Sequence, residues 1–136
     1  MKRVTLTEEL LTVYPYLEVE IMDYLEKNSH RGRPVKHLHG SKCMVFDGYI
    51  NPGGYGILSL CRPSIFPYHI YGYAHRAAYM VWIGKILQGM KVLHLCDFED
   101  CINPDHLYLG TMKDNLTDAT IRRFYANPNN RTWKLT

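Results

Sequence analysis

The sequence predicts an α+β domain with an N-terminal helical segment, then β-hairpins, then a small strand–loop–strand–helix unit tied by a metal ion. Three observations predict this class. Apolar residues recur at spacings of three and four between Leu17 and Leu25, as on one face of a helix. The turn sequence N-P-G-G at residues 51–54 separates two short apolar runs. Residues 91–120 contain two short apolar strands around a loop with metal-binding side chains.

The length and composition indicate one domain of ordinary size. A chain of 136 residues buries about two-thirds of its unfolded surface, so its core does not depend on a metal. No apolar run approaches the roughly 18 residues of a membrane span, and acidic residues follow Lys2 and Arg3 where a signal peptide would be apolar. We therefore expect a cytoplasmic protein with no membrane partner, whose four cysteines are reduced and free to bind metal.

The net charge of +3 is unevenly distributed along the chain. Residues 1–27 hold six acidic and three basic residues, which leaves thirteen basic and seven acidic residues in the remainder. A basic surplus of this kind suits a surface that binds phosphate groups. The part of the chain after residue 27 is therefore expected to bind nucleic acid.

Residues 1–28 form the predicted N-terminal helical segment. Thr5 and Glu8 have the spacing of a capping box, and Pro15 divides the segment into a short helix and a longer one that starts near Tyr16. The longer helix is expected to pack its apolar face on the core and to leave its acidic face in solvent.

Residues 29–42 are polar and basic, and we predict a linker there. Within it Arg31-Gly32-Arg33-Pro34 matches the core of an AT-hook, in which an extended R-G-R segment lies in the minor groove of A·T-rich DNA. A plain flexible linker and a groove contact by Arg31 and Arg33 both remain open.

The next elements follow from turn residues and periodicity. We predict a hairpin over residues 43–60, an irregular hairpin over 61–72 whose second strand is Tyr68–Ile70, and a helix over 73–83 that Gly84 ends. Thr111 and Asp114 begin a last helix, to about Tyr125, with a basic face formed by Lys113, Arg122 and Arg123. Residues 127–136 form a polar tail.

The central unit carries zinc-type ligands at even spacing, Cys96-x4-Cys101-x4-His106. A structural zinc site uses four protein ligands in a tetrahedron, so a fourth must come from elsewhere in the chain. His94 precedes the first ligand on a predicted strand, and Asn115 follows the last one in the predicted helix. A loop with two ordinary cysteines is the competing interpretation.

Residues 94–115, H-L-C-x4-C-x-N-P-x-H-L-x-L-G-T-x-x-D-N, resemble the HNH nucleases of the His-Me finger (ββα-metal) type, and most closely the zinc-loop homing endonucleases. The segment from Cys43 to Gly56 resembles the leading part of that family, and A-H-R-A-A-Y at residues 74–79 resembles its helix. The resemblance covers Cys43 to about Arg123, and we place the nuclease domain at residues 43–126.

The resemblance implies a role for each matching residue. Cys43 occupies the position of the family's leading cysteine and becomes the fourth zinc ligand, with Cys61 as the rival. His94 becomes the general base, Asn115 the ligand of a catalytic Mg²⁺ that Mn²⁺ can replace, and Asn103 a brace for both the loop and the base through hydrogen bonds. His94 could instead be a structural histidine or a zinc ligand.

Further roles concern the DNA. Either Arg76 or Arg62 supplies positive charge at the phosphate, and the hairpin of residues 61–72 lies in the major groove in family members. The candidate contacts of this hairpin are Arg62, Tyr68, His69 and Tyr71. Burial of its aromatic side chains in the core is an equal alternative. Many HNH proteins have a metal-binding aspartate before the catalytic histidine, where this chain has Leu93. The metal is therefore expected to rest on Asn115 alone.

The expected function is Mg²⁺-dependent hydrolysis of double-stranded DNA by a homing or phage type endonuclease, in the host cytoplasm if a phage encodes it. No small-molecule substrate is expected, and a homodimer would suit cutting of both strands. A zinc-stabilised DNA-binding module without catalysis is the main alternative, and an RNA nuclease or a toxin is a third.

Overall fold

The structure is a computed structural model that describes residues 2–63 and 66–111, and it confirms the predicted α+β class. Its helices and strands are β1 (Lys2–Thr5), α1 (Glu8–Val13), α2 (Leu17–Lys27), β2 (Ser29–Val35), β3 (Ser41–Phe46), β4 (Tyr49–Ile50), β5 (Gly56–Cys61), β6 (Tyr68–Tyr73), α3 (Ala74–Trp82), β7 (Lys91–His94) and β8 (Leu107–Gly110). Two short 3₁₀ helices cover Lys36–Leu38 and Pro104–His106. No helix in the described ranges is long and apolar enough to cross a membrane.

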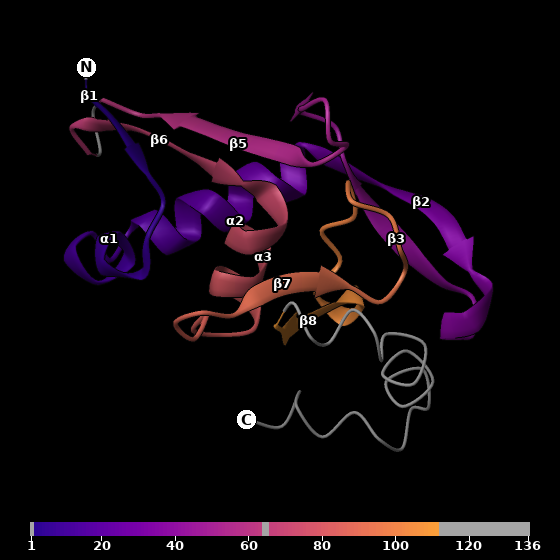
Figure 1. Ribbon diagram of the computed structural model, residues 1–136. Coiled ribbons are helices and arrows are strands. Elements are labelled where there is room, and N and C mark those ends of the chain that lie inside the picture. The colour runs from indigo at the N-terminus through magenta and orange to yellow at the C-terminus, as the bar shows by residue number, and fades with distance from the viewer. Residues whose placement is uncertain (1, 64–65, 112–136) are drawn as a thin grey trace.

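A four-stranded sheet in the order β1-β6-β5-β4 packs one face against α2 and α3 (Figure 1). The helix α2 contributes Leu17, Ile21 and Leu25, each fully buried, as its period of three and four predicted. Alternate residues of β5 and β6 meet them, because side chains of a strand point to opposite faces in turn. The core-facing residues of the sheet and α3 include Leu58, Leu60, Ile70, Ala74, Ala77, Ala78 and Val81.

A second, smaller core joins the β2–β3 ribbon to the β7–β8 hairpin. It contains three cysteines together with apolar residues, namely Val35, Leu38, Cys43, Val45, Leu95, Cys96, Cys101 and Tyr108. The loop that connects β7 to β8, drawn in orange, lies between these two pairs of strands (Figure 1). Phe46 N donates to Asp100 O at 2.9 Å and Ile102 N to Met44 O at 2.8 Å, so the backbone of the loop is bonded to β3.

The first 42 residues contain two strands that the sequence did not predict. Before the predicted helices, β1 pairs in parallel with β6, with Val4 opposite Ile70. The predicted linker, residues 29–42, begins with the antiparallel strand β2, in which His30 lies opposite Val45 of β3. Its polar sequence concealed the strand because one face is open to solvent and only Val35 is buried. Gly32 allows the close approach, since a Cβ at this position would overlap the Val45 side chain.

The predicted hairpin over residues 43–60 has a different first strand. The return strand β5 pairs with the two-residue β4, Tyr49 opposite Ile57, whereas β3 turns away to pair with β2. The break follows Phe46, whose ring fills the space beside Gly48 and Gly56 and packs on Tyr24 of α2 at a ring-centroid distance of 6.2 Å. Phe46 thus joins the main sheet, the helical layer and the ribbon.

This packing gives a first prediction. An alanine Cβ at position 56 would lie 2.5 Å from Phe46 Cδ2, so Gly56→Ala must displace a buried ring and is expected to lower the free energy of unfolding by about 1–3 kcal/mol. Gly84→Ala is the control, because nothing lies within 4 Å of its Cβ. Urea unfolding of both variants measures the effect, and equal stabilities would contradict the packing of Phe46.

Candidate metal centre and active site

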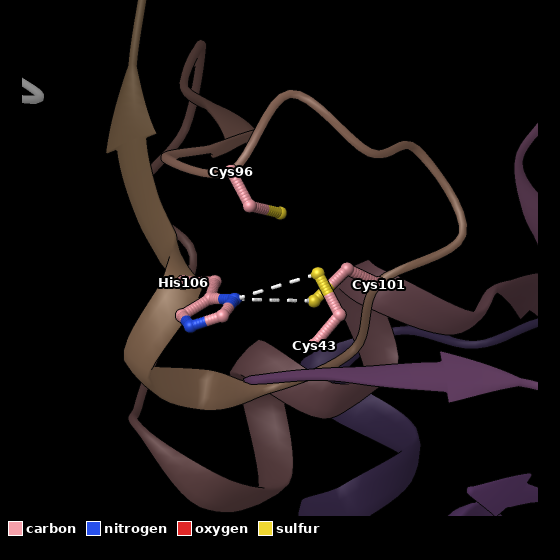
Figure 2. A group of neighbouring side chains, drawn as sticks. All are labelled: Cys43, Cys96, Cys101 and His106. Atoms are coloured by element: carbon pink, nitrogen blue, oxygen red, sulfur yellow. Dashed lines mark hydrogen bonds between the residues drawn. The ribbon is translucent and has the colours of Figure 1, made fainter. Parts of the chain in front are cut away.

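Four buried ligand-type residues meet in the smaller core: Cys43 from β3, Cys96 and Cys101 from the loop, and His106 from the second 3₁₀ helix. Their ligand atoms all lie within 4.8 Å of one another. Nδ1 of His106 lies 3.4 Å from Cys101 Sγ and 3.7 Å from Cys43 Sγ, and the Cys96 sulfur points toward the same space (Figure 2). Cys61 is exposed at the end of β5 and takes no part in this cluster.

The dimensions of the cluster fit a tetrahedral zinc site. Bonds of about 2.0 Å to nitrogen and 2.3 Å to sulfur place tetrahedral ligand atoms about 3.5–3.8 Å apart, close to the separations from His106. Nε2 of His106 lies 2.8 Å from Ser41 Oγ, a hydrogen bond that fixes the ring and leaves Nδ1 to face the sulfurs. The buried Cys3His cluster can therefore bind zinc.

The pKa shifts of the three thiols also favour binding of a metal cation. Hydrogen bonds from Cys43 and Cys96 lower the pKa of Cys101, whereas the hydrogen bond with Cys101 raises the pKa of Cys43 to about 12 and also raises that of Cys96. Without a cation the cluster thus favours a single thiolate. A divalent ion that binds all three sulfurs would supply the charge needed to ionise the other two.

Asn103 fastens the end of the loop. Its Oδ1 accepts from Asp105 N at 2.9 Å, which caps the 3₁₀ helix of residues 104–106, and its Nδ2 donates to Lys42 O at 2.8 Å. These bonds join the segment before His106 to β3. They brace the loop, and neither of them involves His94.

His94 ends β7, opposite Leu107 of β8. Its Nε2 lies 2.9 Å from the backbone oxygen of Cys101. A carbonyl oxygen only accepts, so Nε2 carries the ring proton and Nδ1 carries the lone pair. Burial lowers the pKa of His94, which favours the neutral ring. The arrangement yields a neutral imidazole whose basic nitrogen is Nδ1, held by the same residue that supplies a zinc-type ligand.

A cavity of about 130 Å³ opens beside His94, lined also by Tyr55, Val92, Leu93, Asp97 and Glu99. Two aromatic rings support the histidine: His75 of α3 at a centroid distance of 4.9 Å and Tyr55 at 6.4 Å. Tyr55 also contacts His75, at 5.3 Å. His94 therefore packs against a layer of rings and also lines a small cavity.

His75 is the most deeply buried member of this layer. Its side chain is 6% exposed, and its Nδ1 has no hydrogen-bond partner among the described residues. Burial lowers its pKa to about 3, and the nearby charges of His94 and Arg76 act in the same direction. His75 thus stays neutral in the folded protein throughout the physiological range.

This burial predicts a pH dependence of stability. The unfolded chain protonates His75 near pH 6.5 and the folded chain only near pH 3, so unfolding becomes easier as the pH falls below about 6.5, by up to about 1.4 kcal/mol per unit. Between about pH 7.5 and 5.5 the zinc-loaded wild type is expected to lose about 1 kcal/mol more than His75→Phe. Urea unfolding of both at each pH measures this, and identical losses would contradict a neutral buried His75.

The other predicted DNA-binding residues are spread over the surface. His69 and Tyr71 lie on the sheet face away from the helices, where His69 Nε2 is 2.6 Å from Ser59 Oγ. Tyr68 instead packs against the core and Tyr14, at a ring distance of 6.2 Å, as the buried alternative predicted. Because β1 was not expected, the sequence did not place Arg3 beside Tyr71, where its guanidinium lies 5.0 Å from the ring centroid.

The predicted arginines differ in their surroundings. Arg62 is half exposed, with Nε 3.8 Å from Glu20 Oε2, and Arg31 is exposed on β2. Arg76 lines an apolar cavity of about 250 Å³ beside β6 rather than the cavity at His94. Arg33 pairs with Asp100 of the zinc-type loop. Residues 112–136, and with them Lys113, Asn115, Arg122 and Arg123, lie outside the described residues.

Comparisons with known proteins agree with this geometry. The model of a family described as HNH endonuclease matches residues 72–117. Protein 7.7 of Escherichia phage T7 is 33% identical over 94 residues, which cover 69% of this chain and 67% of the relative. Protein 2.8 of the same phage is 35% identical over 78 residues, 57% of this chain and 49% of the relative.

No solved structure matches the chain at a significant level. The matched segment of 72–117 holds α3, the β7–β8 hairpin and three of the four clustered ligands, and Cys43 joins them from outside it. With a relative 33% identical and two-thirds covered, the chain belongs to the HNH endonuclease family.

Proposed function

We propose that this protein is a metal-dependent endonuclease that hydrolyses phosphodiester bonds in double-stranded DNA. The observation that carries the proposal is the hydrogen bond between His94 Nε2 and Cys101 O, which leaves Nδ1 as the basic nitrogen of a histidine that lines a cavity. Membership of the HNH endonuclease family supports the same conclusion.

His94 is the general base of this proposal. Nδ1 takes a proton from a water molecule, whose oxygen attacks phosphorus as the bond to the 3′ oxygen breaks, leaving 5′-phosphate and 3′-hydroxyl ends. General base catalysis contributes about 10²–10⁴-fold to such a rate. The rings of Tyr55 and His75 pack against the His94 ring.

The metal requirement of the proposal has two parts. Zinc in the Cys3His cluster is structural, since four protein ligands leave no position for a reacting water. A catalytic Mg²⁺, or Mn²⁺ in its place, would neutralise phosphate charge and stabilise the leaving oxygen. Asn115 is the residue proposed to hold it. In the described part of the same cavity Leu93 offers no ligand atom, whereas Asp97 and Glu99 carry carboxylates.

DNA is proposed to lie across the sheet face that bears Arg3, His69 and Tyr71, with Arg62 at its edge. These side chains combine positive charge, hydrogen-bonding groups and aromatic rings on a sheet whose four strands contain no acidic residue. The basic residues proposed for the last helix, Lys113, Arg122 and Arg123, would add phosphate contacts. A homodimer and a location in the host cytoplasm belong to the same proposal.

A binding module without catalysis is the second candidate, because the zinc-type cluster alone would suit it. Incubation of the purified protein with supercoiled plasmid, with Mg²⁺ or with EDTA, separates the two. Mg²⁺-dependent open circles would indicate nicking, and discrete linear products a double cut. DNA that is bound but stays supercoiled in Mg²⁺ and in Mn²⁺ would refute the nuclease and leave the binding module.

A further inference from the structure

Arg33 stands out among the basic residues because its contacts point into the protein. Its Nη2 lies 2.5 Å from Asp100 Oδ1, and its guanidinium carbon lies 3.8 Å from the centroid of the Phe98 ring. Both partners belong to the four-residue stretch between Cys96 and Cys101. A guanidinium that pairs and stacks at the same time holds its neighbours in a fixed geometry, which a lysine cannot reproduce.

The backbone explains how Arg33 reaches the loop. The register of β2 against β3 shifts between Arg31 and Pro34, and such a bulge re-aims the side chain within it. Gly32 lies against Val45, so the bulge sits directly on β3, the strand that carries Cys43. Arg33 therefore contacts the loop from the same β2–β3 ribbon that carries Cys43, one of the clustered ligands.

The charge of the zinc-loaded cluster is a second reason to connect Arg33 with the metal site. Three thiolates and a neutral histidine around Zn²⁺ leave one net negative charge in a buried site. Arg33 is close enough to Cys43 for its positive charge to act on that thiol, and its Nε is buried without a hydrogen-bond partner among the described residues. A buried donor of this kind calls for an acceptor.

The loop also connects Arg33 to the proposed base. Asp100 O accepts from Phe46 N at 2.9 Å, and the next residue, Cys101, presents its oxygen to His94 Nε2 at 2.9 Å. A shift of Asp100 would therefore move both a sulfur and the carbonyl that orients His94. Even a small displacement of His94 would slow the reaction, because a general base must lie at hydrogen-bond distance from the water that it activates.

We propose that Arg33 is a positioning residue that locks the loop between Cys96 and Cys101, so that zinc is retained and His94 is held in place. Arg33 lies on β2, outside residues 72–117, which the family model matches. The effect on zinc stands independently of the proposed nuclease activity, whereas the effect on His94 rests on it.

The test compares Arg33→Ala and Arg33→Lys with Lys36→Ala, which removes an exposed charge from the same connection between β2 and β3. Zinc release to excess chelator is followed with a metal indicator. Arg33→Ala is expected to release zinc about 10–100-fold faster than wild type, Arg33→Lys nearly as fast, and Lys36→Ala at the wild-type rate. Cleavage kinetics should show a lower kcat for Arg33→Ala with little change in KM for DNA.

Two results would overturn the proposal. Zinc release at the wild-type rate in Arg33→Ala would show that Arg33 does not help to retain zinc. A raised KM with unchanged kcat would show that Arg33 contacts DNA instead. If Arg33→Ala does not fold, Asp100→Asn tests the same ion pair with nearly the same shape, and wild-type zinc release there would equally refute it. If wild type itself lacks cleavage, the proposed function fails while the zinc measurement still decides on the lock.

Discussion

Replacing His94 with alanine is expected to lower the cleavage rate about 10²–10⁴-fold, because the proposed general base is lost while no clustered ligand is touched. Zinc content and DNA affinity should stay near the wild-type values. Plasmid cleavage, zinc analysis and a DNA-binding titration on the same preparation measure the three quantities.

The control for this variant is His39→Asn. His39 is an exposed histidine with φ of 57°, a backbone conformation that asparagine tolerates. It should cleave like wild type. Loss of zinc in His94→Ala would show that His94 is a metal ligand, and full cleavage by that variant would remove it from the mechanism.

Cys101→Ser is expected to have the largest effect on the whole molecule. It removes a fully buried sulfur that faces both Cys43 and His106, and zinc binding in small zinc peptides is worth on the order of 10 kcal/mol. We expect a zinc content near zero, a much lower Tm and no cleavage, since the carbonyl of residue 101 also orients His94.

Cys61→Ser provides the matched control, because this cysteine is exposed and lies outside the cluster. It should keep wild-type zinc content and Tm. Zinc bound at full stoichiometry by Cys101→Ser would contradict the ligand set, and equal losses in the two variants would mean that the cysteines act through something other than the cluster.

The parts of the fold that were predictable from the sequence are those with local signals. The helices α2 and α3 follow from apolar periodicity, and the strands on either side of the loop from short apolar runs next to metal-type ligands. Cys43 lies far from the other ligands along the chain, so local spacing could not place it. Only its family resemblance suggested the position that it occupies in the cluster.

The missed elements depend on long-range pairing. The strand β1 contains Lys2 and Arg3 and is held by β6, some 66 positions later, so nothing in its own sequence marks it as a strand. The strand β2 is polar because its outer face meets solvent, and its R-G-R segment matched an AT-hook for the same reason. Arg33 faces inward only because the bulge and the acidic loop lie together in space.

The central claim is that a zinc-held loop fixes His94 as a neutral base with its proton on Nε2. Long-range ¹H–¹⁵N NMR correlation of the histidine rings, with His94→Ala for assignment, tests it in the zinc-loaded and the zinc-stripped protein. We predict a neutral His94 ring with the proton on Nε2 when zinc is bound. After zinc is removed, we expect that the ring no longer shows this single tautomer. A proton on Nδ1, or a His94 signal unaffected by removal of zinc, would contradict it.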